Sequence, residues 1–343
     1  MTWAQLDTLK ALCDVSAVSG FEREAAEVIV PLIKEHCDRL YYDKCGSLVA
    51  FRKGSKVSGN TPVAYFAHLD EVGFMIRGIE EDGTLLFEQV GMRPEVLRSK
   101  RVLIGKERLP GVIGAKPVHL GAGKEKPDAE SLYIDIGARS REEAEKCGVY
   151  AAQAVFENDF CVFGGGKLVR SKALDDRFGC LEMVELMKRG VTRDSYFVFT
   201  AGEEIGGVSA MAAATAISPA AAVILEATTA SDLPETKERD TVCRLHHGAV
   251  APFMDGGSRA DEAFYHSIRK IADERGIPVQ TKTRIAGGTD AASIQRAAGG
   301  FRCMTVSLPC RYIHTASCVA AIDDMDACLA LVYAIDESWE ALL

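Results

Sequence analysis

The sequence lacks the marks of several large classes of protein. Its 343 residues contain only two tryptophans, and its 11 cysteines are scattered without a CxxC pair. This odd cysteine count argues against a disulfide framework and favours reduced thiols, as in a cytoplasmic protein. No apolar run reaches the roughly 18 residues of a membrane-spanning helix. The N-terminus also lacks a basic stretch followed by an apolar run, so we expect neither a signal peptide nor a membrane partner.

Positive charge is not concentrated in any part of the chain. The net charge is −9, and the 40 lysines and arginines are dispersed among 49 acidic residues. Because binding to a phosphate backbone needs a concentrated basic face, we exclude nucleic acid as the main partner. The composition, 48% hydrophobic and 26% charged, is that of a folded globular protein. The chain is long enough for one large domain or two ordinary ones.

Strand-like and helix-like segments alternate near the start of the chain and again after residue 166. Short apolar runs typical of buried strands occur at residues 62–67, 196–200, 221–225 and 302–307. Helical periodicity occurs at residues 21–36, 206–216, 261–275 and 325–335. This alternation predicts an α/β fold in which helices cover both faces of a mostly parallel sheet, giving three layers.

The helical pattern nearly disappears between residues 72 and 165. Short alternating runs take its place, separated by glycine, proline and charged turns, and the one clear helix is at 139–147. This texture predicts a small all-β domain, residues 72–165, with a PDZ-like or barrel architecture. It would interrupt a catalytic domain formed by residues 1–71 and 166–343. Two roles are open for this insertion, a lid and an oligomerisation module.

Polar residues stand where the predicted strands end or where a predicted helix begins. These residues are His68, Asp70, Asp175, Asp176, Glu203, Glu204, Glu226 and His314. In open α/β sheets, ligands bind in the crevice beyond the carboxyl ends of the strands. We therefore expect these side chains to meet at one edge of the sheet.

Each of these residues also has an ordinary structural alternative. His68 is compatible with a structural role, the Glu203-Glu204 pair with a solvated helix face, and Asp175-Asp176 with a helix cap. Taken together, two histidines and three carboxylates suit zinc, cobalt or manganese. A carboxylate can bridge two such ions, and a second carboxylate beside them can act as general base on a metal-bound water.

Seven short motifs extend the pattern over nearly the whole chain, and with them the sequence resembles a known family. They are SAVSGFE (16–22), AHLDEVGFM (67–75), ALDDRFG (173–179), FTAGEEIGG (199–207), LEATTASDLPE (225–235), GGTDA (287–291) and RYIHT (311–315). In this order they resemble the glutamyl aminopeptidase and "cellulase M" family of tetrahedral di-zinc aminopeptidases, which is related to the co-catalytic metallo-exopeptidases. The resemblance implies a zinc-exopeptidase-like catalytic domain.

The resemblance implies two divalent metal ions in each subunit, with zinc expected first and cobalt or manganese as alternatives. His68 and Glu226 would bind one ion, Glu204 and His314 would bind the other, and Asp175 would bridge them. Many relatives carry Asp where Glu226 stands, but the longer side chain offers the same ligand atoms. After the His314 position, many relatives read Ser-Pro where this chain has Thr-Ala.

The resemblance also implies the remaining roles in the site. Asp70 would orient His68, Glu203 would be the general base, and the peptide bond after Asp175 would be cis. A pairing of His68 with Asp70 is also what the His-x-Asp spacing permits, because a carboxylate on the second imidazole nitrogen fixes the tautomer. The expected reaction is hydrolysis of the N-terminal peptide bond of peptides.

Three other functions remain open beside the aminopeptidase. A deacylase or dipeptidase acting on small amides would use the same metal centre. An endoglucanase would need two carboxyls flanking a sugar bond, but it leaves the histidines without a purpose and has only two tryptophans for stacking sugars. A non-catalytic oligomer with a vestigial site is the last alternative.

Substrate choice and assembly are less marked in the sequence. Gly287, Gly288 and Asp290 are candidate substrate contacts, because glycine lets the backbone approach a ligand closely. An acidic preference would need a cation, for which Arg284, Arg302 and Arg311 are candidates. The resemblance implies pairing through the β insertion into dimers and assembly of a hollow tetrahedral dodecamer.

Overall fold

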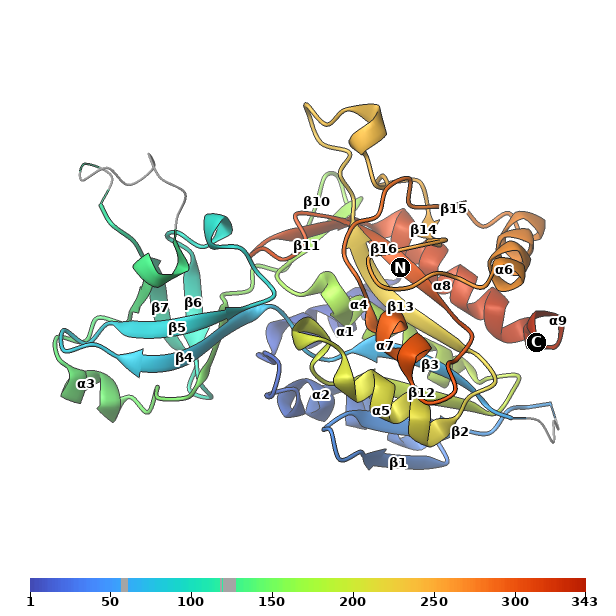
Figure 1. Ribbon diagram of the computed structural model, residues 1–343, viewed down its shortest axis with the longest axis horizontal. Coiled ribbons are helices and arrows are strands. Elements are labelled where there is room, and N and C mark those ends of the chain that lie inside the picture. Colours follow the sequence, from blue (N-terminus) through green and yellow to red (C-terminus); the bar gives the residue numbers. More distant parts are fainter. Residues whose placement is uncertain (57–60, 118, 120–127) are drawn as a thin grey trace.

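We describe the protein from a computed structural model, which covers residues 1–56, 61–117, 119 and 128–343. Figure 1 shows two parts side by side, a larger α/β part and a smaller β barrel. The predicted α/β class with a separate all-β unit is confirmed at this level. No helix in the described ranges has both the length and the hydrophobicity to span a membrane.

The α/β part contains, within the described residues, an 11-stranded mixed sheet. Its strands in spatial order are β1 (Arg39–Tyr42), β2 (Leu48–Arg52), β12 (Ser195–Thr200), β3 (Val63–His68), β13 (Ala222–Thr229), β16 (Cys303–Arg311), β17 (Cys318–Ala321), β11 (Leu168–Ser171) and β10 (Cys161–Phe163), and β14 (Ala249–Val250) and β15 (Val279–Gln280) join beside β16. The sheet is parallel from β12 to β16. Both flanks are antiparallel, so the expected parallel pattern describes the centre of the sheet.

Helices cover both faces of this sheet. Those on one face are α1 (Trp3–Asp14), α2 (Arg23–Ile33), α4 (Leu174–Arg189), α6 (Glu262–Glu274) and α8 (Ile322–Glu337), with α9 (Trp339–Leu342) beside α6. Those on the other face are α5 (Val208–Ile217) and α7 (Asp290–Arg296). The buried strand β3 contributes to both cores, because Tyr65 and Ala67 face the first set and Ala64 and Phe66 face the second.

The second part is a closed barrel of six antiparallel strands. Around the barrel these are β4 (Gly73–Ile79), β5 (Leu85–Val90), β8 (Tyr133–Asp135), β7 (Leu109–Gly114), β6 (Arg101–Ile104) and β9 (Gln153–Phe156). Phe74 lies at the centre of its core, with ring centroids 5.1 Å from Phe87 and 5.3 Å from Phe156. The helix α3 (Arg141–Lys146) begins at the N-cap Ser140. The limits 72–165 stay a prediction; within them, β10 pairs with β11 in the large sheet.

Short 3-10 turns complete the described structure. They are η1 (Lys34–His36), η2 (Pro94–Val96), η4 (Ala129–Ser131), η5 (Glu203–Ile205) and η6 (Glu238–Asp240). The turn η5 stands between β12 and α5, and α5 begins at Val208 rather than at residue 206 as the sequence predicted. Gly206 and Gly207 have φ values of 117° and 65°, a left-handed backbone that the helix cannot include. The turn is therefore held apart from the helix that follows it.

Candidate metal centre

The polar residues expected at strand ends lie together at one edge of the central sheet. His68 is the last residue of β3, and in the parallel register it stands opposite Thr200, the last residue of β12. Glu203 and Glu204 follow in η5. Glu226 differs from expectation, because β13 continues to Thr229 and places this carboxylate inside a buried strand.

Two groups of potential metal ligands share Asp175. In the first, His68 Nε2 lies 3.2 Å from Asp175 Oδ1 and 3.4 Å from Glu226 Oε1. In the second, His314 Nε2 lies 3.2 Å from Asp175 Oδ2 and 3.6 Å from Glu204 Oε1. Within each group, the potential ligand atoms all lie within 4.8 Å of one another. Each oxygen of Asp175 thus faces a different histidine.

The surroundings of these groups suit cations. The Oε1 atom of Glu204 is buried and has no hydrogen-bond partner among the described residues, which is costly for a carboxylate unless a cation completes its contacts. Burial raises the pKa of Glu204 to about 8 and that of Glu226 to about 7. Nitrogen and oxygen donors in this number fit zinc-like ions. The residues present are therefore suited to two divalent ions.

The two histidines respond to the same concentration of negative charge. Burial opposes the charged imidazole of His68, but Glu226, Asp175 and Asp70 outweigh it and raise the pKa of His68 well above its ordinary value. Burial likewise opposes the charge of His314, whose pKa Asp175 and Glu204 raise to about 9. A site that holds protons this firmly has a strong electrostatic affinity for positive charge.

Asp70 contacts His68 and also connects it to η5. The Nδ1 atom of His68 lies 3.0 Å from the backbone oxygen of Asp70 and 3.4 Å from its carboxylate oxygen Oδ1. The carboxylate accepts hydrogen bonds from Ser19 Oγ at 2.6 Å and from the backbone N–H groups of Glu203 and Glu204 at 3.1 Å each. Asp70 therefore fixes the distance between β3 and η5. Ser19 belongs to the SAVSGFE motif, where the sequence suggested only the start of a helix and gave it no role in the site.

The adjacent residues Asp175 and Asp176 have different surroundings. The peptide bond between them is cis, as the resemblance implied, and both have non-helical backbone angles before α4 continues. Asp176 is fully buried and accepts hydrogen bonds from the backbone N–H of His68 at 3.1 Å and of Gly179 at 3.0 Å. The cap that the sequence allowed for this pair is thus made by Asp176, and Asp175 is left to face the histidines.

A cavity of about 420 Å³ opens beside these groups. Glu203 lines it, and burial raises the pKa of Glu203 well above the usual range of a carboxyl. Gly287 and Gly288 line it as well. Asp290 lies behind the wall instead, buried, and accepts a hydrogen bond from Thr200 Oγ1 at 2.7 Å. Of the candidate substrate contacts, Gly287 and Gly288 therefore line the cavity, whereas Asp290 lies behind its wall.

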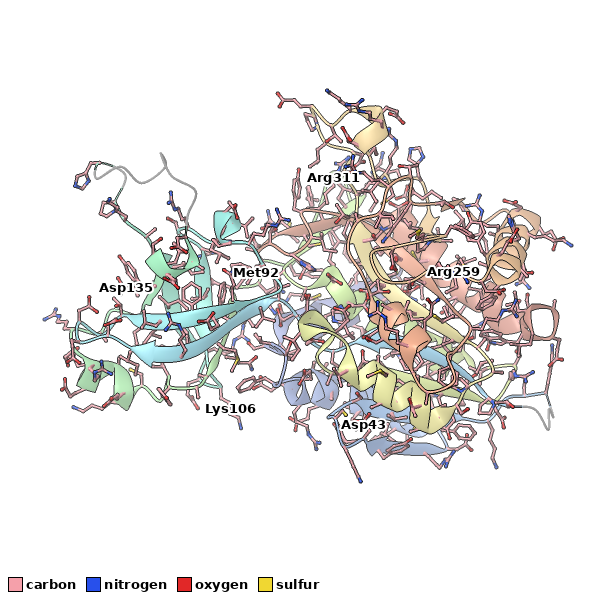
Figure 2. All side chains as sticks on the ribbon, viewed as in Figure 1. Asp43, Met92, Lys106, Asp135, Arg259 and Arg311 are labelled. Carbon is pink, nitrogen blue, oxygen red and sulfur yellow. The ribbon has the colours of Figure 1, made fainter. Side chains whose placement is uncertain are left out.

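Part of the cavity wall comes from the barrel, which sequence reasoning did not foresee. Gly91, Arg93 and Val96 line the cavity. Figure 2 labels Met92, in the middle of this segment, on the side of the barrel that faces the α/β part. Gly91 has φ 72°, and a Cβ atom there would overlap the carboxylate of Glu204. The segment therefore comes close to a candidate ligand that lies 113 residues further along the chain.

Comparison with known proteins identifies the family of the chain. A family model described as M42 glutamyl aminopeptidase matches residues 46–331. The putative aminopeptidase FrvX of Escherichia coli is 32% identical, over 95% of this chain and 93% of its own. The structure of aminopeptidase APDkam598 from Desulfurococcus kamchatkensis has a TM-score of 0.92 at 33% identity, covering 97% and 94%. The chain belongs to the M42 glutamyl aminopeptidase family, and it is a peptidase.

Other relatives differ in their described substrates and assembly. A lysyl aminopeptidase of Pyrococcus furiosus is 29% identical over 96% of both chains. The TET1 peptidase of Pyrococcus horikoshii, described as assembling into a tetrahedron or a large octahedral shell, has a TM-score of 0.85 at 30% identity, covering 97% and 99%. A Thermotoga maritima structure described as an endoglucanase has a TM-score of 0.81 at 31% identity, covering 97% and 98%. Family membership alone thus leaves the preferred substrate open.

Proposed function

We propose that the protein is a di-metal aminopeptidase that removes N-terminal residues from peptides. The observation that carries this proposal is the position of Asp175, whose two oxygens face His68 and His314 on the wall of the cavity that Glu203 also lines. His68 and Glu226 would hold one ion, and Glu204 and His314 the other. Zinc is the first expectation, with cobalt and manganese as alternatives.

The proposed chemistry divides between the ions and Glu203. Bound divalent ions lower the pKa of water and polarise a carbonyl group. Glu203 would accept the proton of the attacking water and later deliver it to the leaving amine. A general base works best when its pKa lies near the working pH, and burial moves the pKa of Glu203 upward in that direction. The carboxylate of Asp70 would keep Glu203 in place by accepting a hydrogen bond from the backbone N–H of Glu203.

Metal removal and replacement test the proposal. We expect the protein treated with a chelator and dialysed to lose hydrolysis of leucine anilide. Addition of zinc, cobalt or manganese, each separately, should restore it, with full activity near two equivalents for each chain. Hydrolysis that continues at its original rate in protein from which metal analysis finds both ions removed would contradict the proposal.

Two alternatives use the same cavity and need their own substrates. A deacylase would prefer N-acyl amino acids to aminoacyl anilides, so a panel of both distinguishes it. The relative described as an endoglucanase justifies one further assay, on carboxymethyl-glucan. Sugar hydrolysis that resists chelators would favour the glycosidase, because that chemistry uses two carboxyls and no metal ion.

A further inference from the structure

A buried group of charged side chains lies where the chain passes from the α/β part into the barrel. It consists of Glu71, Lys172 and Arg177, whose exposed fractions are 1%, 3% and 0%, and we call it the charge cluster. The carboxylate of Glu71 accepts hydrogen bonds from Lys172 Nζ and, at 3.2 Å, from Arg177 Nη2. Buried charges are costly unless they are paired in this way. The ion pairs therefore hold the three residues together in the interior.

Each member of the charge cluster is close in sequence to a residue of the candidate metal centre. Glu71 directly follows Asp70, just beyond the end of β3. Lys172 stands three residues before Asp175, and Arg177 stands two residues after it. Because Glu71 is paired with a cation on either side of Asp175, the charge cluster ties the end of β3 to the start of α4.

The charge cluster also holds residues 15–19, which we call the N-terminal strap. The Nζ atom of Lys172 donates a hydrogen bond to the backbone oxygen of Val15 at 2.9 Å. The carboxylate of Glu71 accepts one from the backbone N–H of Ala17 at 3.1 Å, and the backbone N–H of Glu71 donates to the backbone oxygen of Ala17 at 2.9 Å. The cluster thus fixes the strap from the side of the α/β part.

The N-terminal strap is fixed from the barrel as well, and it ends at Asp70. The side chain of Gln153, a buried residue of β9, accepts a hydrogen bond from the backbone N–H of Val18 at 2.9 Å and donates one to the backbone oxygen of Ser16 at 3.2 Å. Ser19 Oγ donates to the Asp70 carboxylate at 2.6 Å. The strap therefore gives the charge cluster a second route to Asp70, beside the peptide bond that joins it to Glu71.

We propose that the charge cluster is a positioning element of the metal centre, which holds Asp70 and Asp175 in their places relative to each other. Its three side chains are among the described residues, and none of them lines the cavity, so the cluster acts through these two aspartates. The inference rests on the di-metal part of the proposed function. Groups that support metal ligands from behind contribute about 10- to 100-fold to metal affinity or activity.

Zinc binding to the apo-protein tests the positioning role without any turnover. Lys172→Met removes one buried cation, puts an apolar chain in its place and leaves the pair of Glu71 with Arg177. We expect the zinc affinity measured by calorimetry to fall by about 10- to 100-fold, with the circular dichroism of the wild type retained. At saturating zinc, kcat should fall while KM stays unchanged, because Asp70 also accepts the backbone N–H of Glu203.

Arg193→Met is the matched control for loss of a buried cation. Arg193 is 5% exposed and donates to the backbone oxygen of Thr61 at 3.0 Å. It precedes β12 at the N-terminal end of that strand, whereas the metal centre lies beyond the other end. We expect the control to lose thermal stability and to bind zinc like the wild type. An equal fall of zinc affinity in both variants would overturn the positioning role, because lost stability alone would then explain it.

A double-mutant cycle tests whether the charge cluster acts as a unit. Glu71→Gln leaves two buried cations without their shared carboxylate, so it should weaken zinc binding more than Lys172→Met does. In the double variant we expect a loss smaller than the product of the two single fold-changes, as for residues of one network. Fold-changes that multiply, or unchanged zinc affinity in Lys172→Met, would overturn the proposal.

Two further results are decided by the same measurements. If Glu71→Gln does not fold, the comparison of Lys172→Met with Arg193→Met decides the proposal alone. If zinc affinity falls as expected but the zinc-loaded wild type cleaves no peptide, the proposed aminopeptidase function fails and the positioning role stands.

Discussion

Individual carboxylates in this protein differ because of their surroundings rather than their chemistry. Asp175 and Asp176 are adjacent, yet one faces two histidines and the other accepts backbone N–H groups. Glu203 and Glu204 are adjacent as well, and Glu204 lies toward His314 while Glu203 lines the cavity. The sequence shows where two acidic residues are adjacent. Which of the two faces the histidines or the cavity depends on the local backbone conformation, which cannot be read from the sequence.

Replacement of the proposed general base tests the residue assignments most directly. Glu203→Gln keeps the size of the side chain and removes its ability to accept a proton. We expect kcat to fall by about 10²- to 10⁴-fold, with two bound metal equivalents retained and KM little changed. The measurements are steady-state kinetics and metal analysis of the purified variant. Near-normal turnover with both ions bound would assign the base to another residue.

At the scale of elements, the sequence predicted where the central strands β3, β12, β13 and β16 begin better than where β13 and β16 end. The run that ends at residue 67 and the one that ends at Thr200 bring His68 opposite Thr200, with Glu203 three residues further along the chain. Glu226 looked like the end of its strand, because a charged residue normally leaves a buried strand. Pairing with β16 continues beyond it, and Glu226 stands opposite Ser307. The structure places this charge beside His68, which no local pattern could reveal.

The barrel segment beside the candidate centre was equally hidden from the sequence. The sequence around Gly91 does not predict a contact with Glu204, because this contact depends on how the barrel packs against the α/β part. Gly91→Ala should therefore weaken metal binding and lower activity, because the added Cβ overlaps the Glu204 carboxylate. A left-handed backbone alone costs an alanine roughly 1–2 kcal/mol.

Gly148→Ala is the matched control for this substitution. Gly148 also lies in the barrel part, has φ 66°, and would place a Cβ with nothing within 4 Å. We expect Gly91→Ala to lose more thermal stability than Gly148→Ala, because its Cβ would also meet Val72 Cγ1 at 2.6 Å, and we expect loss of metal in Gly91→Ala only. Titration of the apo-proteins with zinc, beside thermal unfolding, separates the two effects. Equal metal affinity in both variants would show that the Gly91 contact does not matter to the site.

For the molecule as a whole, the dimers and tetrahedral dodecamer that the sequence resemblance implied, formed through the barrel, stay a prediction. The support is the relative described as forming a tetrahedron or an octahedral shell. Sedimentation velocity at micromolar concentration should show particles near twelve times the chain mass of 37.0 kDa. A single species at the mass of one chain would contradict this prediction. The separate barrel could be predicted because helical periodicity disappears in that part of the sequence. The surface through which subunits would pair has no repeating sequence pattern, so it could not be predicted in this way.

The barrel wall of the cavity connects assembly to substrate binding. Gly91, Arg93 and Val96 belong to the barrel part, whereas His68 and Glu203 belong to the α/β part. A peptide that contacts both sides favours one placement of the barrel, and any partner that holds the barrel in that placement favours the peptide. By thermodynamic linkage the two effects are equal in size. If assembly holds the barrel in the placement that the peptide favours, the gain in substrate affinity on assembly and the gain in assembly on substrate binding would be equal in free energy.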